Sequence, residues 1–173
     1  MLSRLRPQLF LESVHQIDLR LLRRHGIRGV ILDLDNTLAG WRAPHPTSDV
    51  LRWLKRLHGA GVRAVILSNN RTKRVERFAS DCSIPFIPNA GKPRARNFKR
   101  AIELLGTSVR DTAVIGDQVF TDILGGNRLG LFTILVSPVN REEFIGTKAV
   151  RRVEGVVLRH FGRRGLRTPA NFG

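Results

Sequence analysis

The sequence predicts one α/β domain in which a central parallel sheet is covered by helices on both faces. Apolar runs at 28–34, 62–67 and 112–115 alternate with segments whose apolar residues recur at helical spacing. Strands that are apolar throughout are typical of a parallel sheet buried on both sides. With 173 residues, 42% of them hydrophobic, the chain is long enough to bury a single core.

The expected elements can be placed in chain order from these patterns and from capping residues. Strands are expected at residues 28–34, 62–67, 84–87, 112–115 and 131–136. Helices are expected at residues 17–25, 72–79 and 119–128. Two more helices are expected, one that is capped by Thr47 or Ser48 and one that has Pro93 in its first turn. The order is therefore β-α-β throughout the middle of the chain.

Composition divides the chain into three parts. Residues 28–140 hold the alternating pattern and form the expected core, on which a basic segment at 1–27 packs. Residues 141–173 form a basic amphipathic extension. Its apolar positions at near-helical spacing are Val150, Val153, Val157 and Phe161. Such a segment fits a membrane surface and, equally well, a terminal helix docked on the domain.

The formal net charge of +16 is the unusual feature of the composition. Two basic runs border the polar motifs described below, at Arg71, Lys73, Arg74, Arg77, Lys92, Arg94, Arg96, Lys99 and Arg100. Such charge attracts phosphates, anionic lipid or nucleic acid without indicating a fold. We expect a phosphorylated substrate and an anionic membrane surface as partners. Nucleic acid is less favoured, because no tract interleaves arginines with aromatic residues, and the oligomeric state is not indicated.

Cysteine content and hydropathy bear on the compartment. The single cysteine, Cys82, excludes an internal disulfide and is expected as a small buried or half-buried side chain. The longest uncharged stretch, 129–140, falls short of the ~20 apolar residues that a membrane-spanning helix needs. The first residues lack the apolar core of a secretory signal. We expect a cytoplasmic protein, with peripheral binding to the inner face of the membrane as an alternative that its charge allows.

The segment from Asp33 to Thr37, with the sequence DLDNT, follows the first expected strand directly. In a strand, residues i and i+2 point to the same side, and ligands bind at the carboxyl ends of strands in open α/β sheets. Asp33 is therefore placed to enter a pocket, and Asp35 can face it across a substrate. The alternative is a strand end with a simple turn at Asp35 and Asn36.

Three further polar groups follow the other expected strands. Ser68 and Asn69 close the second strand, Lys92 follows the third, and Asp117 and Asp122 follow the fourth. Each is unremarkable singly, as a helix cap, a surface lysine or a turn. All four loops are expected at one edge of a parallel sheet, and together they supply the groups that phosphoryl transfer requires.

The residue types predict a division of roles. Asp33 attacks phosphorus to form an aspartyl-phosphate, and Asp35 acts as general acid and then general base. Mg²⁺ is expected as the cofactor, held by Asp33, Asp117 and the backbone carbonyl of Leu34, with the Asp35 carbonyl as a further candidate. Asp122 is expected either to bind the metal directly or to lie beside a residue that does. The phosphate-binding residues are expected to be Ser68, Asn69 and Lys92.

The order DxDNT, apolar-SNN, Lys and GDxxxxD resembles the haloacid dehalogenase (HAD) superfamily of aspartate-nucleophile phosphohydrolases, over roughly residues 28–136. The resemblance implies a three-layer Rossmann-like HAD fold. An acid at the second motif position, here Asp35, is typical of the phosphatases of that superfamily, whereas its ATPases carry threonine. The longer segments GIRGVILDLDNTL, IPFI, GKP and IGDQVFTDILGGNRLG resemble the YqeG-type group of subfamily IIIA, which is related to phosphatidylglycerophosphate phosphatases.

The spacing between motifs predicts that no large cap domain covers the site. Only 23 residues separate Ser68 from Lys92, which leaves room for one helix and one short strand. An open site can accept a phosphate carried on a membrane or a macromolecule. Trp41 and His45 lie in the loop after the nucleophile. Trp41 is a candidate contact for the lipid or leaving group, with core packing as the alternative, and His45 is expected on the surface.

The sequence leaves three candidate functions. The first is a Mg²⁺-dependent phosphatase that converts phosphatidylglycerophosphate to phosphatidylglycerol. The second is a soluble phosphatase for a sugar phosphate or nucleotide. The third is a nucleic-acid or ribosome-binding protein with a vestigial pocket, which the intact carboxylates and Lys92 argue against.

Overall fold

A computed structural model describes residues 2–140, and the extension at 141–173 lies outside the described residues. The described part is built on one six-stranded sheet in the order β1-β6-β5-β2-β3-β4. The pairing of all neighbouring strands is parallel. The strands are β1 (Leu9–Leu11), β2 (Gly29–Leu32), β3 (Arg63–Leu67), β4 (Phe86–Ile87), β5 (Thr112–Gly116) and β6 (Phe132–Val136). The predicted parallel sheet is confirmed.

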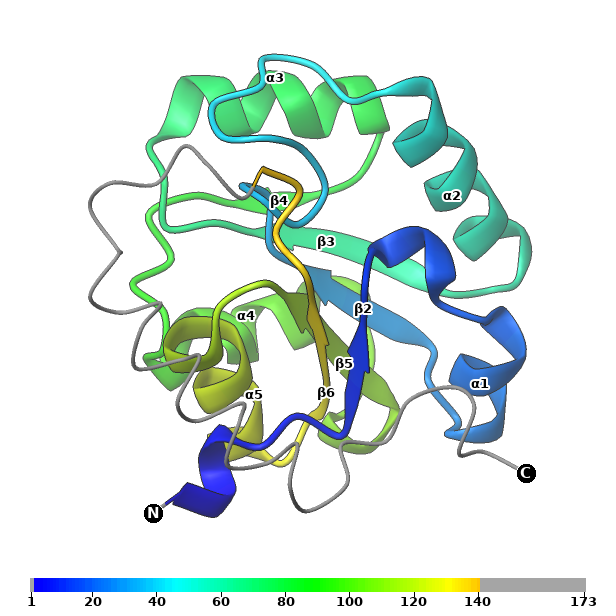
Figure 1. Ribbon diagram of the computed structural model, residues 1–173, viewed down its shortest axis with the longest axis vertical. Coiled ribbons are helices and arrows are strands. Elements are labelled where there is room, and N and C mark those ends of the chain that lie inside the picture. Colours follow the sequence, from blue (N-terminus) through cyan, green and yellow to red (C-terminus); the bar gives the residue numbers. More distant parts are fainter. Residues whose placement is uncertain (1, 141–173) are drawn as a thin grey trace.

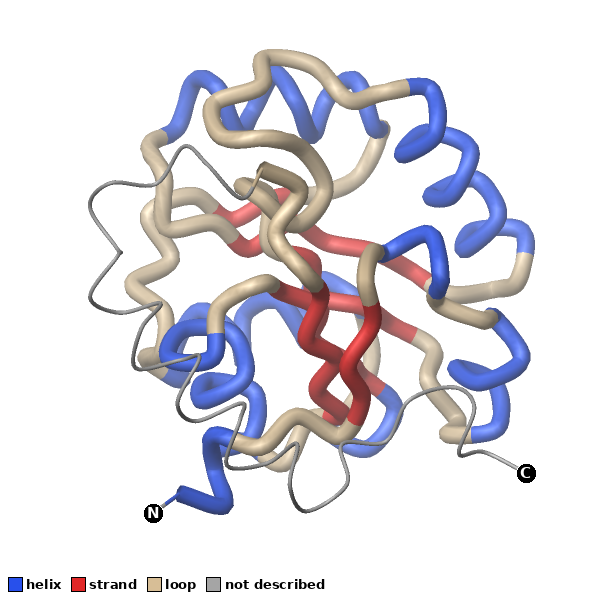
Figure 2. The backbone as a smooth tube through the Cα atoms, in the orientation of Figure 1, coloured by secondary structure: helices blue, strands red, loops and turns tan. Residues whose placement is uncertain are grey.

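Helices cover both faces of the sheet, as the apolar strands predict (Figure 1). The α-helices are α1 (Leu19–Arg24), α2 (Ser48–Gly59), α3 (Thr72–Cys82), α4 (Ala95–Leu105) and α5 (Leu124–Leu129). Three 3₁₀ turns, η1 (Leu2–Leu5), η2 (Val14–Gln16) and η3 (Val109–Asp111), and a π-helical turn, η4 (Val119–Ile123), complete the described elements. Helices α1, α2 and α3 lie on one side of the strands, and α4 and α5 lie on the other (Figures 1 and 2).

Alternation along the strands divides the core between the two faces. Val30 and Leu32 of β2 pack in the same cluster as Phe78 of α3, whereas Ile31 packs with Phe98 of α4. All three β2 side chains are fully buried. Cys82 is buried at the end of α3, as expected. A strand buried on both faces has no polar side, which explains its unbroken apolar sequence.

The structure corrects three local predictions. The basic N-terminal segment contains β1, which pairs with β6 at the edge of the sheet, although no strand was expected before residue 28. Its three residues are too few to show a period. Helix α4 begins at Ala95, and Pro93 lies in the preceding turn, where the Arg94 N–H bonds to the Gly91 carbonyl. The helix expected at 119–128 opens with a π-helical turn.

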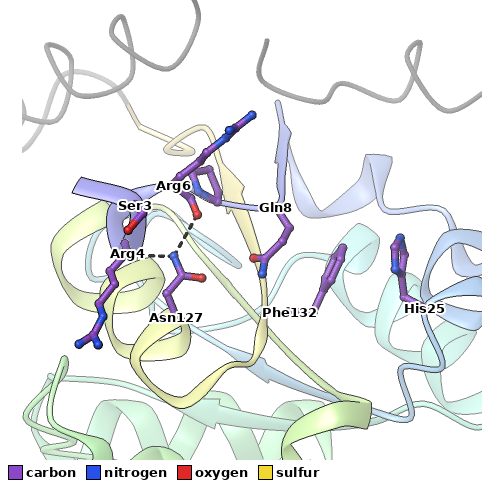
Figure 3. Close-up of a pocket in the computed structure, with 8 residues that line it drawn as sticks. Ser3, Arg4, Arg6, Gln8, His25, Asn127 and Phe132 are labelled. Carbon is purple, nitrogen blue, oxygen red and sulfur yellow. Dashed lines mark hydrogen bonds between the residues drawn. The ribbon is translucent and has the colours of Figure 1, made fainter. Parts of the chain in front are cut away.

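A pocket of about 480 Å³ lies at the amino ends of β1 and β6. Asn127 of α5 donates to the backbone carbonyls of Arg4 (2.8 Å) and Arg6 (2.9 Å), and both arginine side chains point away from Asn127 (Figure 3). Gln8 accepts from the Thr133 N–H at 2.8 Å. These side chains therefore fasten the N-terminal segment to the domain.

The strand order positions the functional site. From β2 the chain proceeds to β3 and β4 on one side, while β5 and β6 lie on the other. The loops after β2 and β5 therefore part at this point and leave a crevice at the carboxyl edge, which is where open α/β sheets bind ligands. Thr47 caps α2 by accepting from the Val50 N–H at 3.3 Å, and so fixes the end of the loop that follows β2.

Candidate active site

The residues predicted from four separate loops meet at the carboxyl edge of the sheet. A cavity of about 220 Å³ is lined by Asp33, Asp35, Ser68, Asn69 and Lys92. Asp117 and Asp122 are buried after β5 and reach the same cluster through Thr37 and Lys92. The cavity is completed by Trp41, Asn70, Gln118 and Thr121.

Asp33 lies at the centre of a buried polar cluster. The Lys92 Nζ donates to Asp33 Oδ1 at 2.5 Å and to Asp122 Oδ1 at 2.6 Å. The Thr37 hydroxyl lies 3.3 Å from Asp33 Oδ2 and 3.1 Å from Asp117 Oδ1. The Lys92 side chain is only 3% exposed, so these charge-assisted contacts are sheltered from water. Lys92 thereby joins Asp33 to Asp122, and the Thr37 hydroxyl joins Asp33 to Asp117.

This cluster has the donor set of a divalent metal site. One carboxylate oxygen from each of Asp33, Asp117 and Asp122 lies within 4.8 Å of the others, and all three residues are buried. Lys92 supplies one positive charge against three carboxylates. Buried carboxylate oxygens with excess negative charge suit a hard divalent cation. The residues present therefore fit a divalent metal ion.

Burial governs the ionisation of the pair at the centre. Burial raises the pKa of Asp33 to about 6, an effect that Lys92 opposes and Asp122 reinforces. Burial alone would lower the pKa of Lys92, but the carboxylates of Asp122 and Asp33 outweigh it and raise the pKa above its ordinary value. Lys92 therefore remains an ammonium ion, which is the form that its predicted phosphate-binding role requires.

Gly116, the last residue of β5, allows Asp122 to approach the strand. A Cβ atom at position 116 would lie 2.3 Å from the Asp122 carboxyl group. The Gln118 N–H donates to Asp122 Oδ2 at 3.3 Å, which orients the carboxylate from the other side. The glycine of the GDxxxxD motif is therefore required by close packing.

Asp35 has a different set of partners from Asp33. Its Oδ2 accepts from the side chains of Asn70 and Arg74, and its Oδ1 accepts from the Arg42 N–H at 3.2 Å. Its side chain is 8% exposed and lines the cavity. The two carboxylates of the DxD motif thus share the cavity but belong to separate hydrogen-bond networks.

Asn69 and Ser68 organise the loop after β3. The Asn69 Oδ1 accepts from the Lys92 N–H at 2.8 Å, and its Nδ2 donates to the Lys92 carbonyl at 3.4 Å. This reciprocal pair fixes the backbone from which the Lys92 side chain extends. The Ser68 hydroxyl accepts from the Asn70 N–H at 3.1 Å and is nearly fully buried.

Three residues were not given roles from the sequence: Thr37, Asn70 and Arg74. Thr37 and Asn70 belong to the quoted motifs DLDNT and SNN, and that membership was the available signal. Arg74 belongs to a basic run that gave no sign of an inward-facing member. The Leu34 carbonyl, a predicted metal ligand, accepts from the N–H groups of Leu38 (3.0 Å) and Ala39 (3.2 Å) within its own turn.

The loop after the DLDNT motif forms one wall of the cavity. Trp41 is half-buried and lines the cavity, and the Arg42 guanidinium lies 5.7 Å from the centre of its ring. The structure therefore places Trp41 in the wall of the candidate active site, and its contact with a lipid or leaving group stays a prediction. His45 is exposed, as expected, and its Nδ1 lies 2.7 Å from Asp81 Oδ2.

This fold, with the DxD motif and a carboxylate cluster at the switch point, is that of an HAD phosphatase. A family model described as HAD-hydrolase-like matches residues 89–145, and a model described as mitochondrial PGP phosphatase matches residues 2–81. The probable phosphatase YqeG of Bacillus subtilis (strain 168) is 38% identical over 159 residues, which cover 92% of each chain. The chain belongs to the YqeG-type family of HAD-superfamily phosphatases.

More distant similarities agree with this family. A chloroplastic/mitochondrial phosphatidylglycerophosphate phosphatase 1 of Arabidopsis thaliana is 28% identical over 93% of this chain, which spans 49% of that protein's length. The cobalt-bound deoxy-D-mannose-octulosonate 8-phosphate phosphatase of Haemophilus influenzae superposes with a TM-score of 0.52 at 18% identity. That match covers 80% of this chain and 91% of the other. The structural similarity shows the shared fold.

Across the described range 2–140, no helix combines the length and the apolar character needed to cross a bilayer.

Proposed function

We propose that this HAD phosphatase is a Mg²⁺-dependent phosphomonoesterase that dephosphorylates phosphatidylglycerophosphate through an aspartyl-phosphate. The observation that carries the proposal is the position of Asp33, which faces the cavity while its carboxylate contacts Lys92 and Thr37. A carboxylate held in this way at a strand end is aimed and shielded from bulk water. Those are the requirements of a nucleophile that must attack phosphorus.

The proposed reaction has two steps. An Asp33 oxygen attacks phosphorus, the bond from phosphorus to the leaving oxygen breaks, and Asp35 gives its proton to that oxygen. Water then attacks the aspartyl-phosphate, Asp35 takes a proton from it, and the bond between phosphorus and Asp33 breaks to release phosphate. Lys92 and the loop beginning at Ser68 hold the phosphoryl oxygens on which negative charge accumulates.

The proposed metal ligands are Asp33, Asp117 and a backbone carbonyl, with Asp122 as a ligand or close behind. We favour the Asp35 carbonyl over that of Leu34, whose oxygen is used within its turn. Mg²⁺ is proposed because all of these donors are oxygen atoms. When bound, the ion neutralises charge between the nucleophile and the phosphate, which would otherwise repel each other.

The lipid substrate is supported by the openness of the site and by its charge. The loops between the motif residues are short, and no large cap lies over the cavity within the described residues. Exposed cations stand at the same edge of the sheet: Arg42 beside Trp41, Arg71 before α3 and Arg94 before α4. Each is worth roughly 1 kcal/mol of attraction to an anionic membrane. Similarity to phosphatidylglycerophosphate phosphatases points to the same head group.

Phosphate release from phosphatidylglycerophosphate in mixed micelles with Mg²⁺ tests the proposal. Asp33→Asn and EDTA are the controls for mechanism, and a soluble sugar phosphate is the control for substrate class. Preferential hydrolysis of the lipid, lost in both mechanistic controls, is the expected result. Hydrolysis of the sugar phosphate alone would retain the mechanism and reject the lipid, and turnover of neither would reject the proposed function.

A further inference from the structure

Arg74 stands apart from the other cations of α3 because its guanidinium faces the active site. Its side chain is 23% exposed, whereas Arg71 and Arg77 of the same basic run are exposed residues. One nitrogen, Nη2, donates to Asp35 Oδ2, and the other, Nη1, donates to the Ala43 carbonyl at 3.1 Å. A single planar group therefore joins helix α3 to the DxD motif and to the loop after it.

The two contacts restrain Asp35 in a defined orientation. Arg74 and Asn70 both bond to Oδ2, while among the residues that the structure describes Oδ1 accepts from the Arg42 N–H alone. Each carboxylate oxygen has two lone pairs, so Oδ1 keeps one that can exchange a proton with the substrate. Because the guanidinium is rigid and planar, its two nitrogens hold Asp35 Oδ2 at a fixed position relative to the Ala43 carbonyl.

The same residue also holds the wall of the cavity. Ala43 follows Trp41 and Arg42 in the loop that carries the Asp35 Oδ1 contact. The bond from Arg74 to the Ala43 carbonyl keeps this loop against α3. Loss of Arg74 would therefore remove one hydrogen-bond donor from the proton-transferring carboxylate and the bond that holds the cavity wall against α3.

We propose that Arg74 is the positioning residue for the general acid-base Asp35, and that it acts where the leaving oxygen must be protonated. The proposal rests on the proposed function of Asp35. In the first step the bond from phosphorus to the leaving oxygen breaks, and the proton on Asp35 moves to that oxygen. A leaving alkoxide requires this proton, whereas a nitrophenolate is stable without it. The contribution of Arg74 consequently depends on the leaving group.

The test compares kcat/KM of wild type and Arg74→Gln for phosphatidylglycerophosphate and for p-nitrophenyl phosphate. The expected loss is on the order of 10²-fold for the lipid, within the range of general acid-base catalysis, and less than about tenfold for the nitrophenyl ester. Arg77→Gln is the matched control, since it removes an exposed cation one turn along the same helix and should change neither value. Guanidinium ion at millimolar concentration should restore part of the lipid activity of Arg74→Ala.

The outcomes separate this inference from the function on which it rests. Equal losses on both substrates, or no loss on either, would overturn the role of Arg74 even if Asp33→Asn remains inactive. A wild-type protein that hydrolyses neither substrate would overturn the proposed function and this inference together. A differential loss without guanidinium rescue would point to loop displacement and count against the role of the guanidinium itself.

Discussion

The two ends of the sheet both carry a pocket, and they differ in how their polar groups are used. The pocket at the amino ends of β1 and β6, which we call the amino edge, has about 480 Å³. Its Asn127 and Gln8 side chains bond to the protein's own backbone. The pocket at the carboxyl edge has about 220 Å³ and contains buried charges, including Asp33 and Lys92. Buried ionised groups are costly to a fold, so their presence indicates function better than the size of a cavity does.

The largest expected effect follows from removing the cation of the carboxyl edge. In Lys92→Met, Asp33 and Asp122 lose their shared partner while remaining buried. We expect the free energy of unfolding to fall by about 3–5 kcal/mol, the usual cost of breaking a buried ion pair. Chemical denaturation in EDTA measures it.

Lys99→Met is the matched control, because Lys99 lies exposed on α4. Its free energy of unfolding should stay within about 0.5 kcal/mol of wild type. Equal free energies of unfolding for the two variants would mean that the buried contacts of Lys92 do not stabilise the fold. Buried charge would then not distinguish the carboxyl edge from the amino edge.

The pH dependence of stability gives a second test, again without metal. Burial raises the pKa of Asp33 from 3.8 to about 6, so the protonated carboxyl stabilises the fold below pH 4, and this contribution is lost as the pH rises through about 6. The difference corresponds to at most roughly 3 kcal/mol. The unfolding free energy of wild type relative to Asp33→Asn should therefore decline between pH 4 and pH 7 in EDTA. A difference in unfolding free energy that stays constant over that interval would show that burial does not raise the pKa of Asp33.

Gly116→Ala should have a smaller effect at the same edge. The new methyl group would meet the Asp122 carboxyl at 2.3 Å, so we expect a loss of about 2 kcal/mol and weaker stabilisation by added Mg²⁺. Thermal unfolding with and without Mg²⁺ measures both. Gly59→Ala is the control, because a Cβ at position 59 has no neighbour within 4 Å. Equal responses of the two variants to Mg²⁺ would separate Gly116 from the metal site.

The sequence was sufficient for the features that repeat along the chain. Unbroken apolar strands predicted the parallel sheet, and the polar residues after each strand predicted which side chains would meet, since parallel strands bring their carboxyl ends to one edge. It was insufficient where a contact depends on one side chain among similar neighbours. Arg74 and Arg77 look alike in a basic run, and only the packing of α3 directs Arg74 towards Asp35. Strand β1 was missed because its pairing with β6 joins residues far apart in the chain.

The smallest expected effect belongs to the amino edge and tests the comparison from the other side. Asn127→Ala removes the two hydrogen bonds to the Arg4 and Arg6 carbonyls and one accepted from Thr133. The carbonyls of the exposed Arg4 and Arg6 can turn to water when released, and the buried Thr133 hydroxyl keeps Gln8 as a partner, so we expect a loss of about 1–2 kcal/mol in the free energy of unfolding. Phosphatase activity per folded molecule should be unchanged, because the pocket and the catalytic cavity lie at opposite ends of the strands. A reduced kcat in the fully folded variant would mean that the amino-edge pocket is coupled to the active site. Hydrogen bonds to the protein's own backbone would then not identify a purely structural region.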